Sequence, residues 1–131
     1  MTANASPLRF AALNGDGISP EIMAATLAVL RAAAAKWQFE CVSDEQEVGL
    51  RPLATLGTTF PESAFEAAKA ADGIILGPVS HNDYPPAEKG GINPSGELRV
   101  VFELFANIRP CRSRARSPRP CLPVAPRAPC G

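Results

Sequence analysis

The stretch LRFAALNGDGISPE, residues 8–21, decides the fold that we expect for this chain. Its apolar first part predicts a strand over residues 8–13, and the Asn-Gly-Asp-Gly sequence that follows is typical of a tight turn. Ser19 suits a helix N-cap and Pro20 suits the first helical position. Apolar residues at three- and four-residue spacing then predict a helix over residues 20–36. A strand, a loop and a helix in this order make the first half of a βαβ unit.

The rest of the chain continues this alternation of strands and helices. A second strand is expected over residues 37–42, followed by a polar run, whereas residues 48–57 fit no element. A proline followed by a glutamate predicts a helix over residues 61–70. The apolar run at residues 74–76 is continuous, as in a central strand covered by helices on both faces. After a long loop, apolar spacing up to Phe105 predicts a short helix entered near the proline at position 94.

These elements predict an α/β fold with a largely parallel sheet, in which ligands bind beyond the carboxyl ends of the strands. Gly15 and Gly17 are expected to be turn residues with positive φ. His81 is the only histidine, and a lone histidine in a loop, without partners, is not assigned a catalytic role.

Composition divides the chain into two unlike segments. Its 131 residues are 46% hydrophobic and 20% charged, which is typical of one globular domain and excludes a disordered, collagenous or coiled-coil protein. Residues 1–109 hold 13 acidic and 8 basic residues, a net charge of −5, whereas residues 110–131 hold 5 arginines and no acidic residue. We expect residues 1–109 to be the folded part and residues 110–131 to be a disordered basic tail rich in proline, arginine and cysteine.

Neither a membrane segment nor a metal site is expected from the sequence. The most apolar early stretch, residues 22–35, is too short and too charged to span a bilayer, so we expect a cytoplasmic protein. The four cysteines have neither a zinc-ligand spacing nor a redox spacing, and no metal ligand is assigned to them.

Three sequence motifs together are typical of a known protein family. They are LNGDGISPE at residues 13–21, FPE leading to KAADGIILGP at residues 60–78, and NPSGELR leading to FANIRP at residues 93–110. Their order and spacing over residues 8–112 resemble the isocitrate and isopropylmalate dehydrogenases, which are β-hydroxyacid oxidative decarboxylases. The resemblance implies part of a three-layer dehydrogenase domain. A Rossmann fold is not expected, because the Gly-Asp-Gly turn lacks the third glycine of the G-x-G-x-x-G fingerprint.

The resemblance also implies an activity. Family members oxidise a 2-hydroxy diacid such as isopropylmalate, isocitrate or a tartrate-like acid with NAD or NADP. They then release carbon dioxide with the help of Mg²⁺ or Mn²⁺, and they act as homodimers. Arginine suits a diacid because its planar guanidinium can donate two parallel hydrogen bonds to a carboxylate.

Particular residues take roles from the resemblance. The substrate-binding residues that it implies are Arg99, Arg109, Asn93 and Ser95. The cofactor-binding residues that it implies are Gly77, Pro78, Val79, Ser80, Gly90 and Gly91. The residue pattern alone favours a solvated position on a helix for Arg99, and the resemblance reverses this preference.

The chain departs from the family in two places. Gly49-Leu50 stands where the family has a double glycine. The proton-transfer tyrosine and lysine and the metal-binding aspartates are expected beyond residue 112, so no catalytic residue and no metal ligand is assigned, and Tyr84 is not given the catalytic role. We therefore expect a truncated oxidoreductase that is inactive alone, with an uncovered sheet edge and marginal stability. The alternative is a carboxylate-binding remnant without turnover.

The basic tail has two interpretations. A changed reading frame in a GC-rich coding sequence produces such a composition, and this interpretation is favoured. The alternative is a basic arm that binds nucleic acid. It is disfavoured because the tail has no interleaved aromatic residues.

Overall fold

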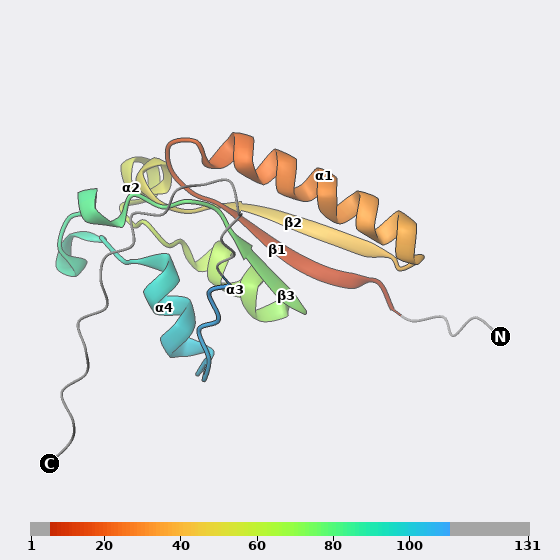
Figure 1. The fold of residues 1–131 in the computed structure, drawn as a ribbon. Coiled ribbons are helices and arrows are strands. Elements are labelled where there is room, and N and C mark those ends of the chain that lie inside the picture. Colours follow the sequence, from red (N-terminus) through yellow and green to blue (C-terminus); the bar gives the residue numbers. More distant parts are fainter. Residues whose placement is uncertain (1–5, 111–131) are drawn as a thin grey trace, which may run out of the picture.

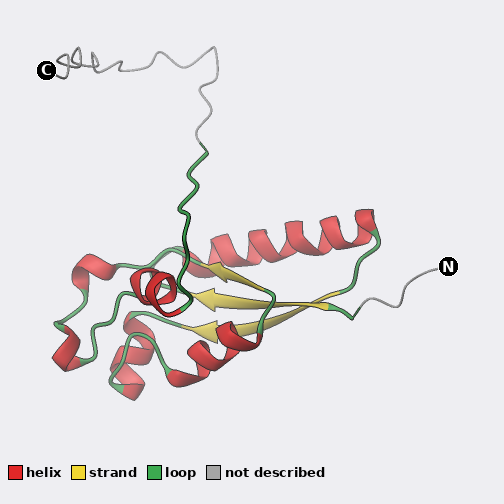
Figure 2. Ribbon diagram, turned by 90° about the horizontal axis from the view of Figure 1, so that it is seen from below, coloured by secondary structure: helices red, strands yellow, loops and turns green. Residues whose placement is uncertain are grey.

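The strand β1 (Leu8–Asn14) is the centre of a parallel three-stranded sheet, flanked by β2 (Cys41–Glu47) and β3 (Gly73–Leu76). The computed structural model describes residues 6–110, and β1 pairs in parallel with both neighbours (Figures 1 and 2). The parallel sheet confirms the predicted α/β class. The expected disorder of the basic tail concerns residues outside the described part, apart from residue 110.

Helices cover both faces of the sheet and complete three layers. The helix α1 (Ser19–Trp37) covers one face, and α3 (Glu62–Ala70) and α4 (Pro94–Val101) cover the other (Figure 1). The short helix α2 (Leu50–Leu56) follows β2, and the two 3-10 turns η1 (His81–Asp83) and η2 (Ala87–Lys89) lie in the loop before α4.

The alternation of side chains along β1 divides the core into two clusters. Ala12 faces α1 and packs with Met23 and Leu27. Ala11 and Leu13 face the opposite side, where a larger cluster includes residues of α3 and α4. The fully buried β1 side chains therefore belong to two separate packing layers, as expected for a strand with helices on both sides.

The second strand differs from its prediction. Residues 37–42 were expected to form it, but α1 extends to Trp37 and the strand is Cys41–Glu47. Gln38 ends the helix with a φ of 55°, and the polar run that was not expected to be a strand pairs with β1 along its length. This strand lies at one edge of the described sheet, where its backbone bonds to β1. Its acidic side chains Asp44, Glu45 and Glu47 are exposed, and Ser43 and Gln46 are partly buried.

The third strand also differs in one respect. Its apolar run was expected to mark a central strand, but among the described strands β3 pairs with β1 alone and lies at the other edge. Ile74 and Leu76 pack toward the α3 cluster and Ile75 toward the α1 cluster. A continuous apolar run indicates that both faces of a strand are covered. It does not indicate whether the strand has a neighbouring strand on each side.

Smaller corrections concern the ends of helices. Ser19 is not the N-cap of α1: Ile18 occupies that position, and Ser19 is the first helical residue. The final helix ends at Val101, so Phe105 is not part of it and is fully exposed at 102%. Residues 50–56, which fitted no predicted element, form α2. The remaining predicted helices are confirmed within one residue at each end.

Candidate functional site

A cleft of about 750 Å³ opens at the carboxyl ends of the strands, on the side of the sheet that α1 covers. This volume lies in the range of small-molecule sites. Apolar side chains from α1 and from the end of β2 line part of it, and charged side chains line its rim. The lining includes Met23, Leu27, Val48, Arg31, Glu45 and Arg51.

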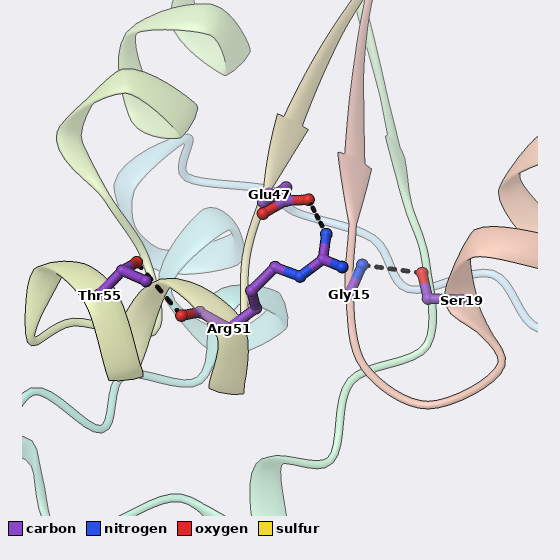
Figure 3. Close-up of polar contacts among 5 residues, drawn as sticks. All are labelled: Gly15, Ser19, Glu47, Arg51 and Thr55. Carbon is purple, nitrogen blue, oxygen red and sulfur yellow. Dashed lines mark hydrogen bonds and ion pairs between the residues drawn. The ribbon is translucent and has the colours of Figure 1, made fainter.

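The loops at this edge are locked together by close packing. A Cβ atom on Gly15 would overlap the carbonyl oxygen of Pro78, and a Cβ atom on Gly77 would overlap the hydroxyl of Ser19. The Gly15 amide donates a 2.7 Å hydrogen bond to the same hydroxyl, Ser19 Oγ (Figure 3). Gly17 has the predicted positive φ of 57°, but Gly15 does not, so the expectation for Gly15 was wrong. Gly15 is required for close approach rather than for an unusual φ.

Asp16 is the polar centre of these loops. Its side chain is buried, with 9% of the residue exposed, and its carboxylate accepts three hydrogen bonds. Oδ1 accepts from the Leu50 amide at 2.7 Å, and Oδ2 accepts from the Ser80 amide at 2.9 Å and from the Tyr84 hydroxyl at 2.5 Å. A buried carboxylate needs such donors to offset its lost hydration. The carboxylate thus connects the start of α2 with the loop after β3.

Tyr84 is perturbed by this contact. Burial raises the pKa of its phenol well above the ordinary value of 10.0, and the hydrogen bond to Asp16 and the negative charge of Asp16 raise the pKa further. The phenol therefore stays protonated and donates its hydrogen bond to the carboxylate over the whole physiological pH range.

The residues predicted to bind a cofactor lie in two places. Gly77, Pro78, Val79 and Ser80 follow β3 at the carboxyl edge, and Ser80 is the predicted site residue that lines the cleft. The amides of Gly77 and Ser80 already donate to Leu13 O and Asp16 Oδ2. A bound cofactor would therefore meet side chains and carbonyl groups of this loop rather than these two amides.

Gly90 and Gly91, the other predicted cofactor residues, are in close contact with neighbouring loops. A Cβ atom on Gly90 would overlap the carbonyl oxygen of Gly57, and one on Gly91 would overlap that of Pro85. The fully buried Thr59 holds this segment, because its amide donates to Gly90 O at 2.9 Å. Packing alone therefore explains both glycines.

Three of the predicted substrate residues are together at the start of α4. Asn93 is the N-cap, and its Oδ1 accepts from the Ser95 amide at 3.1 Å and from the Gly96 amide at 3.4 Å. Arg99 donates to Ser95 O at 3.0 Å and to Ser95 Oγ at 2.8 Å. Two of the five guanidinium N–H groups are then engaged, and the remaining groups can bind a carboxylate.

Arg109, the fourth predicted substrate residue, is not joined to this group. It lies exposed on the segment that follows α4, and no hydrogen bond within residues 6–110 connects it to Asn93, Ser95 or Arg99. The structure therefore joins three of the four predicted substrate residues by hydrogen bonds, and Arg109 lies apart from them.

An ion pair and a hydrogen bond lie at the rim of the cleft on α2. Arg51 pairs with Glu47, and the Thr55 hydroxyl donates to Arg51 O at 3.3 Å (Figure 3). These contacts lie on the exposed surface, so they add little to stability. The Arg51–Glu47 pair places one charge of each sign at the lining of the cleft.

The described residues do not fit the divalent metal that the resemblance implies. Within residues 6–110, no three His, Cys, Asp or Glu side chains are grouped closely enough to hold a metal ion. Asp16, the buried carboxylate at this edge, already accepts three hydrogen bonds from protein groups. Over the same residues, no helix has the length and apolar character that a membrane crossing requires.

The sequence motifs do not reveal the contacts that organise this site. Asp16 lies in the Asn-Gly-Asp-Gly turn and Tyr84 lies in the loop after β3, and their side chains form a hydrogen bond across 68 residues of sequence. The one local signal was the Asn-Gly-Asp-Gly turn itself, which places a short acceptor side chain at a strand end.

The fold and the site together define an α/β protein of the kind that binds small molecules at the carboxyl edge of a parallel sheet. The family model for isocitrate/isopropylmalate dehydrogenase matches residues 9–125, and the chain belongs to this family. The match extends beyond residue 112, where the resemblance in the sequence motifs ends.

Relatives with known names support this assignment. The chain is 40% identical over 100 residues to 3-isopropylmalate dehydrogenase of Streptococcus thermophilus (strain CNRZ 1066), an alignment that covers 76% of this chain and 29% of the relative. It is 38% identical over 112 residues to 3-isopropylmalate dehydrogenase of Geobacter sulfurreducens, covering 81% of this chain and 30% of the relative. The chain therefore spans less than a third of the length of these relatives.

Solved structures share the fold. A β-decarboxylating dehydrogenase from Thermococcus kodakarensis, in its apo form, matches with a TM-score of 0.57 and 23% identity, covering 73% of this chain and 27% of that chain. The TT0538 protein from Thermus thermophilus matches with a TM-score of 0.56 and 27% identity, covering 72% of this chain and 18% of that chain. The α/β architecture of residues 6–110 is thus one that a dehydrogenase of known structure contains.

Proposed function

We propose that this chain contributes the carboxylate-binding part of an oxidoreductase that oxidatively decarboxylates a 2-hydroxy diacid with NAD or NADP. The observation that supports this most directly is the hydrogen-bonded group of Asn93, Ser95 and Arg99 at the start of α4. A guanidinium held by two hydrogen bonds loses little rotamer freedom when it binds a carboxylate. The similarity to 3-isopropylmalate dehydrogenases makes 3-isopropylmalate the first acid to test.

In this proposal Arg99 binds one substrate carboxylate and Arg109 binds the other. Both residues are exposed, and Arg109 lies on the segment that leads away from the sheet after α4 (Figure 2). Arg109 would therefore come into place only when the acid binds. The residues after β3 would contact the nicotinamide cofactor, which supplies the hydride acceptor.

We infer that the 131-residue chain binds the acid without turning it over. The chain spans about 29% of the length of its relatives, and the described residues do not group ligands for the divalent metal. The carboxylate-binding alternative makes the same prediction, because in that alternative the chain binds the acid and catalyses no reaction. Both versions place a diacid on Arg99, and they differ in whether NAD⁺ binds as well.

The test measures binding and turnover separately. Titration calorimetry with 3-isopropylmalate should show binding that Arg99→Ala weakens by about 10- to 100-fold, as expected for one lost charge-assisted contact of about 1.5–3 kcal/mol. Arg9→Ala is the matched control, because Arg9 is an exposed arginine at the far end of β1. Equal binding by wild type and Arg99→Ala would refute the proposed role of this arginine.

Turnover is measured as NADH absorbance with 3-isopropylmalate, isocitrate or tartrate, with Mg²⁺ or Mn²⁺ added. We expect none from this chain alone. NADH formation that disappears in Arg109→Ala would show that the chain is a complete catalyst and would contradict this part of the proposal.

A further inference from the structure

Asp16 has no direct part in the proposed binding, yet it contacts the loop that carries the proposed cofactor residues. Its amide donates to Pro78 O at 2.8 Å, and its Oδ2 accepts from the Ser80 amide at 2.9 Å and from the Tyr84 hydroxyl. Hydrogen bonds therefore run in both directions between this residue and the loop. A loop tied at three points to one buried residue has a position that this residue determines.

Asp16 is itself fixed by the other side of the site. The Leu50 amide at the start of α2 donates to its Oδ1, and the Ser19 amide at the start of α1 donates to its carbonyl oxygen at 3.0 Å. A Cβ atom on Gly49 would overlap the carboxylate, so the backbone closes around it. The carboxylate cannot shift without moving the start of a helix.

The contacts of Asp16 with the loop enclose the turn η1. Ser80 precedes this turn and Tyr84 follows it, while the residues of η1 itself are exposed. The Ser80 contact holds the root of the loop, and the Tyr84 contact holds the part beyond the turn. Loss of the Tyr84 hydroxyl would release the second part alone.

We propose that Asp16 is a positioning residue that holds residues 78–84 at the carboxyl edge, and that Tyr84 fastens this loop to it. The inference rests on the proposed function, because residues 78–80 are among those proposed to contact the cofactor. Asp16 acts through the loop and touches no substrate in this proposal. The positioning raises cofactor affinity, since a loop already in place loses less conformational freedom on binding.

The first measurement is amide hydrogen exchange in the full chain at neutral pH. Tyr84→Phe keeps the ring and removes only the hydroxyl, and it should speed exchange of the Asp83 and Tyr84 amides about tenfold, the effect expected for one lost hydrogen bond. Exchange in β1 should not change. Glu88→Gln is the matched control, because this exposed carboxylate lies on η2 in the same loop, away from the amides that are measured. Asp16→Ala removes both carboxylate oxygens and should release Ser80 as well.

The second measurement reports the contact between Tyr84 and Asp16 directly. Tyr84 is the only tyrosine of the chain, so the Raman doublet of its phenol reports this one hydroxyl. The doublet should indicate a strong donor in the wild type and lose that signature in Asp16→Ala. NAD⁺ binding, followed by calorimetry, should weaken about tenfold in Tyr84→Phe, as expected for one lost hydrogen bond, while the midpoint of urea unfolding changes little.

The outcomes separate the two proposals. Faster loop exchange together with weaker NAD⁺ binding in Tyr84→Phe supports both. Faster exchange in a chain whose wild type binds no NAD⁺ supports the attachment of the loop to Asp16, overturns the cofactor part of the proposed function and favours the carboxylate-binding alternative. Unchanged exchange in Tyr84→Phe, or faster exchange with unchanged NAD⁺ affinity, overturns the positioning role and leaves the proposed function standing.

Discussion

The loops at the carboxyl edge and the segment from α4 onward are built in different ways. Around Asp16, residues far apart in sequence touch, and the three glycines Gly15, Gly49 and Gly77 have no space for a Cβ atom. In α4, the contacts of the predicted substrate residues join positions at most four apart. Beyond α4 the chain exposes Phe105 at 102% and Ile108 at 83%. The site side chains of the first region are fixed by tertiary contacts, whereas the predicted substrate residues of α4 are held by local contacts on a helix that Pro94 and Leu98 anchor in the core.

The difference shows that two of the family's motifs have different structural roles in this chain. The Asn-Gly-Asp-Gly turn holds other loops in place, whereas the α4 motif presents side chains to solvent. Changes that disturb the close packing of the first region, such as a Cβ atom on Gly15, should therefore reduce stability, and changes in the second region should reduce binding with small effects on stability.

The largest expected effect is that of Gly15→Ala. The new Cβ atom would overlap the Pro78 carbonyl oxygen, which is backbone and cannot rotate away. We expect a loss of about 3 kcal/mol or more in the free energy of unfolding, measured by urea denaturation. Gly96→Ala in α4 is the control, since its Cβ atom would meet only atoms at 3.7 Å or beyond. It should stabilise the chain by up to about 1 kcal/mol. Equal effects of the two substitutions would break the comparison.

Thr59→Val should have the next largest effect. Thr59 is fully buried, and its hydroxyl accepts from the Ile92 amide at 2.7 Å and donates to Ile92 O at 2.6 Å. Valine has a similar shape and leaves both groups without this partner, so the free energy of unfolding should fall by about 2 kcal/mol. Thr55→Val removes an exposed hydroxyl on α2 and should change it by less than about 0.5 kcal/mol. A Thr59 effect as small as that of Thr55 would contradict the structural role of this contact.

Asn93→Ala tests the second region and should cost about 1 kcal/mol of stability through the lost N-cap. Asn93→Ser sharpens the test, because serine is also a good N-cap and should restore most of this stability. If Asn93 also binds substrate, Asn93→Ser should still weaken binding of 3-isopropylmalate in calorimetry. Full recovery of both stability and binding would assign Asn93 to the cap alone.

The smallest expected effect is a pH dependence that comes from Tyr84. Its pKa is raised in the folded chain above the ordinary value of 10.0, so its contribution to stability is complete below about pH 10 and is lost as the pH rises through the raised value. Urea midpoints should therefore fall more steeply above about pH 10 in the wild type than in Tyr84→Phe. Parallel curves for the two proteins would show that the phenol is not perturbed.

Sequence pattern located the elements that have an apolar face. The residues of β1, α1 and α3 carry such faces, and these elements were predicted within one residue at each end. The strand Cys41–Glu47 has no apolar face, because every residue after Val42 is polar, so periodicity could not find it. The seven-residue helix Leu50–Leu56 is too short to show a period.

The site was less predictable than the fold for a physical reason. The bond from Leu50 to Asp16 spans 34 residues and the bond from Tyr84 to Asp16 spans 68, so neither leaves a local pattern. The contacts of Asn93, Ser95 and Arg99 are local, and there the motif named residues that the structure does bring together. A sequence motif can therefore identify site residues that lie within one helix turn of each other. It cannot identify partners such as Asp16 and Tyr84, which meet only in the folded chain.

The two edges of the described sheet have opposite chemical character, and this limits how copies of the chain could associate. Asp44, Glu45 and Glu47 place negative charge on β2, whereas β3 contributes only a glycine and three aliphatic residues. Charged edge strands resist strand addition, and uncharged ones permit it. Two copies joined through their β3 edges would have only acidic edges left to offer a third. Pairing through this sheet would therefore stop at a closed pair instead of growing into a fibre.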